Sequence, residues 1–280
     1  MPILSRITLY PIKAFPGVDL PEATLTARGA LLHDRAYALV DAGGGFINGK
    51  RKPRIHLLRA ALAFEGETLQ VSVDTPAGVQ VFRLNESGGH AQERQQLEAL
   101  LSEWFGEPVR FIHEPDGGFP DDPSAPGPTM VSRASIDAVR GWFPQLQAAR
   151  LGARFRSNLE LDDCPAFWED QLFGPTFGPT FGPTFGATGS EVGFRIGDSS
   201  FAGTNPCQRC VVPSRDPFTG EVADGFQRHF VERRKDTLPA WVERSRFDTF
   251  YRLAINTRAA EDLSGHLIRV GDPVALTTAT

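Results

Sequence analysis

The chain has 280 residues, of which 41% are apolar and 22% charged, and a formal net charge of −5. This length fits one large domain or two of ordinary size with a sizeable core. The mild acidity excludes wholesale attraction to nucleic acids or membranes. The start, MPILSRITLYPIKAF, lacks the pattern of a signal peptide, and no stretch approaches the roughly 18 apolar residues of a membrane helix. Three cysteines form no disulfide framework, so we expect a protein of the reducing cytoplasm.

The first hundred residues have mostly strand patterns. Alternating or short apolar runs bounded by turn residues predict strands over 6–12, 35–42, 62–73 and 79–84. The 62–73 run contains a turn at EGE, so it predicts a strand on each side. Gly43 to Gly45 form a loop tip, and the pattern that follows predicts a hairpin with its return strand in 46–58.

One helix is predicted over 90–106. Apolar residues recur there at i, i+3, i+4, i+7 and i+8, which places them on one face of a helix, and Gly106 is a typical end signal. The apolar set consists of Leu97, Leu100, Leu101, Trp104 and Phe105.

Prolines, glycines and acids without periodicity follow the helix in HEPDGGFPDDPSAPGPT. We expect a connector at 116–129 that separates an N-terminal domain, 1–115, from a C-terminal domain, 130–280. Residues 130–144 predict a short strand and then a helix. Ser132 or Ser135 is the expected N-cap, and the predicted buried stripe consists of Ile136, Val139 and Phe143.

The second half returns to strand patterns, over 153–161, 192–203, 207–214, 251–258 and 266–276. Gly and Asp separate these runs at short intervals, which favours a closed or nearly closed antiparallel barrel. The expected fold class is therefore α+β and rich in β, with two such modules joined by the connector. A repeat of FGPT runs from Phe173 to Gly186, where proline excludes a helix, so we expect an expanded surface loop.

Two of the three cysteines lie in NPCQRC, from Asn205 to Cys210. A structural zinc site needs four ligands, but the third cysteine, Cys164, lies far upstream and the histidines are scattered. A thioredoxin-type dithiol normally opens a helix, whereas the following VVPSRDPFTG predicts a strand and a turn. An iron–sulfur cluster normally needs four cysteines.

The remaining alternatives are two buried thiols or a reactive one. Most cysteines behave as small buried hydrophobic residues, but Arg209 argues against this, since an unpaired buried guanidinium is costly and would favour a thiolate at Cys210. A thiolate beside basic residues suits a metal that arrives inside an organic, phosphate-bearing cofactor.

Five motifs, in order, resemble the MOSC-domain proteins that carry an N-terminal β-barrel domain. They are LYPIKAFPGV, GALLHDRAYALVD, RFRSNL, NPCQRCVVPSRDPFTGE and IRVGDPVAL. Together they cover nearly the whole chain, and the branch they resemble is that of the mitochondrial amidoxime-reducing component and its bacterial relatives.

The resemblance implies an N-terminal β-barrel-like domain, a C-terminal MOSC β-barrel with a few helices, and a molybdenum cofactor in the cleft between them. By motif position, Cys210 is the catalytic residue and the thiolate ligand of the metal. Sulfur ligands suit a redox-active metal of this kind. Cys207 matches a more variable place and has a supporting role at most.

The resemblance also implies residues that bind the cofactor. Its phosphate needs cations, and arginine can hold phosphate with two bonds. The residues at matching positions are Lys13, Arg35, Arg156 and Asn158. Ser135 or Ser132 could add a hydroxyl contact, and Asn205 and Arg209 could reach the pterin or the oxo groups of the metal.

Some of these residues have structural alternatives. Arg156 and Asn158 would share one face of the predicted strand, but Asn158 could equally cap a turn. Lys13 could be a solvated charge, and Arg35 could pair with Asp34. Ala14 stands where relatives often carry a serine, so one cofactor contact is expected to be missing.

The resemblance implies an oxidoreductase that reduces N-hydroxylated compounds, such as hydroxylamines, amidoximes or hydroxylated bases. The chain has no nucleotide fingerprint or ferredoxin cysteine pattern, so we expect a separate flavoprotein, ferredoxin or cytochrome b5-like donor, and no nucleic acid or membrane partner. Asp216 is a candidate acid, although a turn cap is the favoured interpretation. Two other functions stay open: a sulfur carrier or transferase with a persulfide on Cys210, and a non-catalytic carrier of the cofactor.

Overall fold

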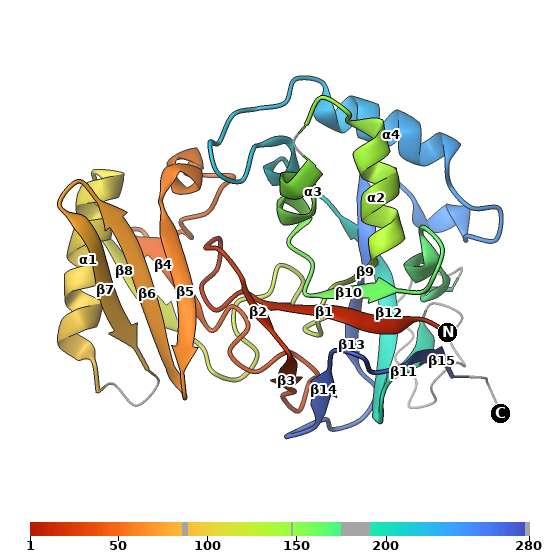
Figure 1. The fold of residues 1–280 in the computed structure, drawn as a ribbon, viewed down its shortest axis with the longest axis horizontal. Helices are drawn as coiled ribbons and strands as arrows, with labels where there is room; N and C mark the ends of the chain where they lie inside the picture. Colours follow the sequence, from red (N-terminus) through yellow and green to blue (C-terminus); the bar gives the residue numbers. More distant parts are fainter. Residues whose placement is uncertain (86–88, 147, 175–190, 278–280) are drawn as a thin grey trace.

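The computed structural model describes the chain apart from residues 86–88, 147, 175–190 and 278–280. It is a mixed α and β fold rich in strands, as predicted, with two unequal parts lying side by side (Figure 1). Most of the FGPT repeat lies outside the described residues, so the surface-loop prediction stays a prediction. Its first residue, Phe173, is buried.

A membrane-spanning helix was not expected from the sequence. Across the described ranges, no helix has the length and apolar character needed to cross a bilayer.

The smaller part consists of a three-stranded sheet, a two-stranded ladder and one helix (Figure 1). In the sheet, β6 (Thr68–Thr75) lies between β5 (Ala60–Glu65) and β7 (Gly78–Leu84). In the ladder, β4 (Tyr37–Asp41) pairs with β8 (Val109–His113). The strands predicted over 35–42, 62–73 and 79–84 are therefore confirmed.

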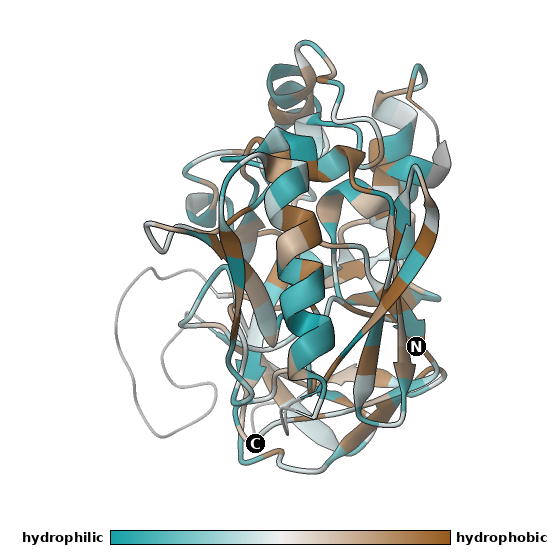
Figure 2. Cartoon of the chain, turned by 90° about the vertical axis from the view of Figure 1, so that its left-hand side faces the viewer, coloured by the Kyte–Doolittle hydropathy of each residue, from teal (hydrophilic) through white to brown (hydrophobic). Residues whose placement is uncertain are grey.

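The predicted helix is α1 (Ala91–Phe105), and it packs against β7 and β8. Leu97 and Leu101 are fully buried in the core of the smaller part, while hydrophilic residues cover much of its outward face (Figure 2). Gly106 has φ 71° and donates its amide to the carbonyls of Ser102 and Glu103 at 2.9 and 3.2 Å. The left-handed glycine thus ends the helix as predicted.

The predicted return strand in 46–58 is wrong. Asp41 accepts bonds from the amides of Gly43 and Gly45, which makes the expected turn, but only one bridge, between Val40 and Phe46, follows it. The segment Pro53–Leu57 forms a 3₁₀ helix, η1. Proline has no amide to donate to a ladder and is compatible with a first helical turn.

The larger part is built on an eight-stranded sheet with the order β15-β11-β12-β13-β9-β10-β1-β2. Backbone bonds between residues 2–4 and 271–274 join the two sides of this sheet, in agreement with a nearly closed barrel. β9 and β10 run parallel, so the barrel is not antiparallel throughout. The strands are β1 (Ile3–Leu9), β2 (Val18–Leu20), β9 (Met130–Ser132), β10 (Leu159–Asp162), β11 (Val192–Ile196), β12 (Ser199–Gln208), β13 (Arg252–Ala259) and β15 (Val274–Leu276), with a separate ladder of β3 (Glu22–Thr24) and β14 (Leu267–Arg269).

The sheet crosses the proposed domain boundary. β1 lies near the N-terminus, yet it pairs with β10 on one side and β2 on the other. The division at 116–129 stays a prediction, but strand pairing does not follow it. β1 and β2 are therefore held by the sheet of the C-terminal half, whereas Ile12 and Phe15 between them pack in the core of the smaller part.

Helices cover one end of the larger part (Figure 1). The predicted N-cap of α2 is confirmed, because the Ser132 hydroxyl accepts a bond from the Ser135 amide at 3.0 Å. Ile136, Val139 and Phe143 are buried as predicted. The helical segments are α2 (Arg133–Trp142), α3 (Ala148–Phe155), α4 (Phe226–Asp236), η2 (Trp168–Gln171), η3 (Val212–Ser214) and η4 (Arg244–Arg246).

The strand predicted over 153–161 is wrong in its first half. Leu151 and Phe155 are both buried in the aromatic cluster between α2 and α4. Residues four positions apart lie on the same face of a helix, so their joint burial favours a helix there. The helix α3 therefore extends to Phe155. Arg156 follows with a left-handed φ of 51°, and β10 begins only at Leu159.

Candidate functional site

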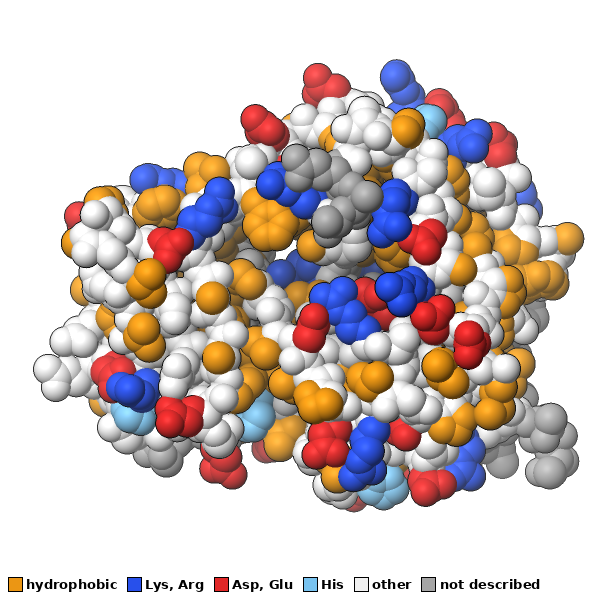
Figure 3. Space-filling view, viewed as in Figure 1, with side chains coloured by type: hydrophobic (Ala, Val, Ile, Leu, Met, Phe, Trp, Pro, Cys, Tyr) orange, Lys and Arg blue, Asp and Glu red, His pale blue; other side chains and the backbone are white. Residues whose placement is uncertain are grey.

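A cleft of about 1450 Å³ lies between the two parts and is lined by both. In Figure 3 it is a hollow with Lys and Arg side chains inside it and around its mouth. Among the residues predicted to bind a cofactor, those that line it are Lys13, Arg35, Arg156, Asn158, Asn205, Arg209 and Cys210. The cleft thus brings together residues that lie almost 200 positions apart.

Cys210 lies just beyond the end of β12, on a segment that turns into η3. The strand predicted over 207–214 is therefore wrong beyond Gln208, since Pro213 has no amide for a ladder. The Cys210 side chain is exposed, and the Val212 amide donates to its Sγ at 3.5 Å.

The other two cysteines are half-buried and unpaired. Burial raises the pKa of Cys207 despite the opposing effect of Arg209. Burial and then Glu169 raise the pKa of Cys164 to about 11. Within the described ranges, no three His, Cys, Asp or Glu side chains gather as a metal site. Cys210 is therefore the accessible thiol.

Arg209 lines the cleft, but its guanidinium is held by backbone carbonyls, and contact with a ligand stays a prediction. Its Nε and Nη2 donate to the Leu253 carbonyl at 3.0 and 2.6 Å, and its Nη1 donates to the Phe155 carbonyl at 2.8 Å. The guanidinium also lies 5.6 Å from the centre of the Phe155 ring. Arg209 thus holds the backbone beside Cys210 in place.

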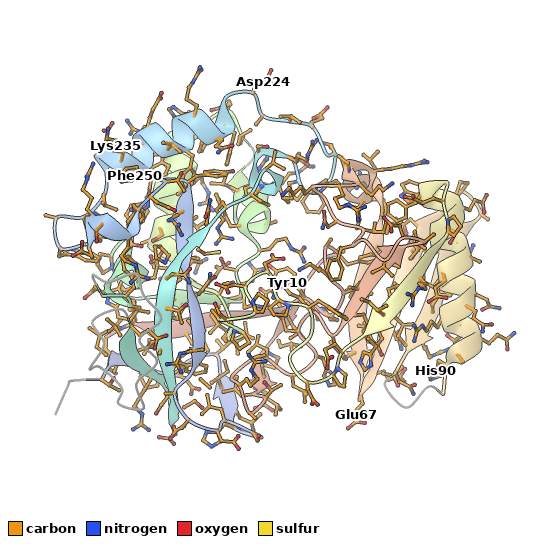
Figure 4. The ribbon with its side chains drawn as sticks, turned by 180° about the vertical axis from the view of Figure 1, so that it is seen from behind. Tyr10, Glu67, His90, Asp224, Lys235 and Phe250 are labelled. Atoms are coloured by element: carbon orange, nitrogen blue, oxygen red, sulfur yellow. The ribbon has the colours of Figure 1, made fainter. Side chains whose placement is uncertain are left out.

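Lys13, Arg35 and Arg156 form what we call the floor of the cleft. Of these three cations, Arg156 has no acidic hydrogen-bond partner among the described residues. Its guanidinium lies 4.1 Å from the centre of the Tyr10 ring, and Nη1 donates to the Phe15 carbonyl at 2.6 Å. Figure 4 shows Tyr10 between the two parts of the molecule. Burial lowers the pKa of Arg156, against the opposing effect of the Tyr10 hydroxyl. An anion beside this guanidinium would offset the cost of its burial.

Lys13 and Arg35 belong to the same floor but have acidic partners. Lys13 Nζ lies 2.5 Å from Asp121 and donates to the Phe119 carbonyl at 2.9 Å. Arg35 pairs with Asp34, as its structural alternative predicted. Burial lowers the pKa of Arg35, but Asp34 and Asp121 outweigh it and the net shift is upward. Both cations therefore line the cleft as members of ion pairs.

Asn158 lies in the loop before β10, so the predicted shared strand face with Arg156 is wrong. Its Nδ2 donates to the Thr8 carbonyl and to Asp34, both at 3.1 Å. Its Oδ1 accepts bonds from Thr129 and from Arg35 at 3.3 Å. The Asn158 side chain therefore bonds to both members of the Asp34–Arg35 pair and holds them in position beside the cleft.

Ser135 is not a cleft residue, which corrects the prediction of a hydroxyl contact. Its side chain is fully buried, donates to Glu169 at 3.0 Å and accepts from the Phe167 amide at 2.5 Å. Ser132, the alternative, is equally buried. Both serines help to bury the Glu169 carboxyl.

Asn205 and Asp216 have polar neighbours of their own. Asn205 Oδ1 accepts from Asn256 at 3.0 Å, and its Nδ2 lies 3.4 Å from Asp122, so it lines the cleft within an amide–acid network. Asp216 accepts the amides of Phe218 and Thr219 at 2.9 and 3.0 Å. This confirms Asp216 as a turn cap.

The prediction missed residues that shape the cleft as much as the named ones. Tyr10 supports the arginine of the floor, and Asp121 and Asp122 come from the connector that was expected to lie between domains. Tyr10 stands in the LYPIKAF motif, so its position was available as a signal. The two acids gave no such signal, because a connector rich in proline and acid is usually solvated.

Two family models match the chain. The MOSC N-terminal beta barrel domain matches residues 1–107, and the MOSC domain matches residues 128–275. The cleft is lined from both matched ranges.

Three curated relatives are each 24% identical to this chain. Mitochondrial amidoxime-reducing component 1 of Homo sapiens aligns over 251 residues, which are 78% of this chain and 67% of that protein. The Xenopus laevis protein of the same name aligns over 97% of this chain and 81% of its own length. Molybdenum cofactor sulfurase of Danio rerio aligns over 77% of this chain but 28% of its own length.

Proposed function

The chain belongs to the MOSC-domain family, and we propose that it is a molybdenum-cofactor-dependent oxidoreductase that reduces N-hydroxylated compounds. The names of the relatives support a function tied to the molybdenum cofactor. Reduction of hydroxylamines, amidoximes or N-hydroxylated bases is the finer part of the proposal. It is supported by likeness to the amidoxime-reducing components over most of the chain.

The observation that carries the proposal is the presence, in one cleft, of an exposed thiol and an arginine without a carboxylate in its hydrogen-bond set among the described residues. A cofactor with a thiolate-bound metal and a phosphate needs a soft ligand and cations. Cys210 is the accessible thiol of the cleft, and Arg156 has no carboxylate in its hydrogen-bond set within the described part of the chain. The donor set therefore fits the cofactor.

The roles of the side chains follow from their contacts. Cys210 would hold the metal, and Arg156, with Lys13 and Arg35, would hold the phosphate. The Val212 amide donates to the Cys210 Sγ. When bound, the cofactor supplies the two-electron chemistry needed to break an N–O bond. Asn158 and Arg209 act as positioning residues.

Electrons must reach this site from a donor. The sequence has no nucleotide-binding or ferredoxin motif, so we propose a separate flavoprotein, ferredoxin or cytochrome b5-like protein as partner. A rate that saturates with the concentration of such a donor would support this part of the proposal.

The proposal is tested by metal content and turnover in matched cysteine variants. The protein is purified from a host that makes the cofactor, and molybdenum and pterin are measured in wild type, Cys210→Ser and Cys164→Ser. Cys164 is half-buried and does not line the cleft. We expect stoichiometric metal in wild type and Cys164→Ser, its loss in Cys210→Ser, and reduction of benzamidoxime with dithionite as donor.

The same samples separate the alternative functions. The similarity to part of molybdenum cofactor sulfurase favours testing a persulfide. Metal-free protein with cyanolysable sulfur on Cys210 would support the sulfur carrier or transferase. Bound metal without turnover under any donor would support the non-catalytic carrier. Metal retained by Cys210→Ser would contradict the role of this thiol.

A further inference from the structure

The cleft has more positive charge than one phosphate requires. Thirteen Lys or Arg and eight Asp or Glu line it, although acids outnumber bases in the whole chain, whose net charge is −5. Its volume of about 1450 Å³ also exceeds the roughly 300–1,000 Å³ of pockets that hold one small ligand. The cleft has both the space and the charge for a second, anionic ligand beside the cofactor.

Three cations that the cofactor assignment does not use lie where the two parts meet. We call Lys50, Arg59 and Arg215 the rim cations; all three line the cleft. Lys50 and Arg59 are exposed side chains of the smaller part, and Arg215 is half-buried in the segment that follows Cys210.

Contacts between residues 56–59 of the smaller part and residues 215–220 bring Arg59 and Arg215 to the same edge of the cleft. Arg59 Nη1 donates to the Phe218 carbonyl at 2.7 Å, which joins residue 59 to the segment after Cys210. Arg215 Nη1 lies 3.5 Å from the Gly220 carbonyl. The Cα of Gly220 faces the His56 side chain, since a Cβ there would lie 3.4 Å from the Cβ of His56.

His56 also lies close to Gly49, the chain neighbour of Lys50, and near Arg156 of the cleft floor. Gly49, beside Lys50, packs so closely on the imidazole that a Cβ would lie 2.5 Å from Nε2. Burial lowers the pKa of His56, and the charges of Arg215 and Arg156 lower it further. Arg215 and Arg156 therefore act on the same imidazole, and Lys50 adjoins the glycine that packs on it.

No acid of the described residues neutralises the rim cations. In the segment 211–224, the ion pairs are formed by Asp216. Its carboxylate lies 3.2 Å from the Arg150 guanidinium and 3.5 Å from that of Arg154. Within the described ranges, no carboxylate lies at ion-pair distance from the three rim cations, and the buried Nε of Arg215 has no hydrogen-bond partner. An anionic group would satisfy these donors.

We propose that the rim cations bind a carboxylate or phosphate of the substrate, so that the enzyme selects N-hydroxylated compounds that carry a negative charge. This inference rests on the proposed reductase function. In this arrangement, Lys13, Arg35 and Arg156 would bind the cofactor phosphate. The second anion would bind to Lys50, Arg59 and Arg215.

The test compares benzamidoxime with 4-carboxybenzamidoxime, which differ by one carboxylate. Holoenzyme with dithionite as donor should show about tenfold higher kcat/KM for the carboxylate, mainly through KM, which is the scale of one charge-assisted hydrogen bond. The Lys50→Gln/Arg59→Gln double variant should lower this ratio to about one. Raising the salt from about 0.05 to 0.5 M should lower it in wild type, because exposed charges are screened.

A matched control and a binding measurement complete the test. Lys235→Gln removes an exposed cation of α4, far from the cleft (Figure 4), and should leave the ratio as in wild type. Calorimetric titration of oxidised holoenzyme with 4-carboxybenzamidoxime should give about tenfold weaker binding in the double variant. Both residues are exposed, so we expect the variant to fold, which its melting curve checks.

The outcomes separate this inference from the proposed function. Metal-loaded protein that reduces neither compound would contradict the reductase, while the titration would still test the anion site. Reduction of both compounds with equal kcat/KM would overturn the inference and leave the reductase standing. Loss of molybdenum from the double variant would assign the rim cations to the cofactor, and a defect seen only with a ferredoxin donor would assign them to protein docking; either result overturns the inference.

Discussion

Glu169 is a buried carboxyl whose replacement should change how stability depends on pH. The side chain is fully buried in η2, and its Oε2 accepts bonds from the Ser132 amide at 3.2 Å and the Ser135 hydroxyl at 3.0 Å. Its Oε1 has no hydrogen-bond partner among the described residues. Burial, and then the charge of Asp170, raise the pKa of Glu169 from 4.5 to about 7.

The sign follows from proton linkage. The folded protein holds this proton more tightly than the unfolded chain, so the contribution of Glu169 is most favourable below pH 4.5 and is lost as pH rises through about 7. A shift of this size corresponds to about 3 kcal/mol of unfolding free energy. Glu169→Gln cannot ionise and accepts the same two bonds, so it should be more stable than wild type by up to about 3 kcal/mol at pH 8 and nearly equal at pH 5.

Urea unfolding of wild type and Glu169→Gln, followed by tryptophan fluorescence at pH 5, 6, 7 and 8, measures this difference. Glu232→Gln, an exposed replacement on α4, is the control and should follow wild type at every pH. A difference between Glu169→Gln and wild type that stays constant from pH 5 to pH 8 would refute the reasoning, because the carboxyl would then not titrate in this range.

Three further predictions concern stability and metal content. Arg234→Met should cost about 3–5 kcal/mol in urea unfolding because it leaves the buried Asp170 carboxylate without its partner; adding Asp170→Asn should recover much of the loss, and no recovery would contradict the pairing. Gly203→Ala should cost about 3 kcal/mol, since its Cβ would lie 2.0 Å from a carbonyl oxygen, whereas Gly141→Ala, in a helix with open space beside it, should raise stability by about 0.5–1 kcal/mol; equal melting temperatures would contradict both. Arg156→Gln should lower cofactor affinity about 10- to 100-fold and change unfolding little, so normal molybdenum content would exclude this arginine from phosphate binding.

The predictions that hold rest on short segments. The apolar spacing from Leu97 and the glycine at 106 were sufficient for α1, because a helix forms its backbone bonds within itself. Ser132 as a cap follows from the same local rule. The exposure of Cys210 agrees with its choice by motif position, while its role as a metal ligand stays a prediction.

The predictions that fail concern side chains whose partners come from distant segments. Asn158 was expected on a strand face with Arg156, but it lies in a loop, and its amide donates to the Thr8 carbonyl, which sequence order does not place beside it. Arg156 was predicted to lie on a strand. Because Phe155 is buried as part of α3, the helix ends directly before Arg156 and no strand forms there. Hydrogen-bond partners of this kind are decided by packing.

The sequence by itself determined the α+β class, the helix at 91–105 and the family motifs, since each depends on residues close together in the chain. Tertiary structure alone decided that β1 pairs with β10, that Ser135 faces Glu169 rather than a ligand, and that Lys50 and Arg59 meet the segment after Cys210. Contacts between such distant segments become favourable only when a whole core and sheet form together, and local propensity does not contain that information.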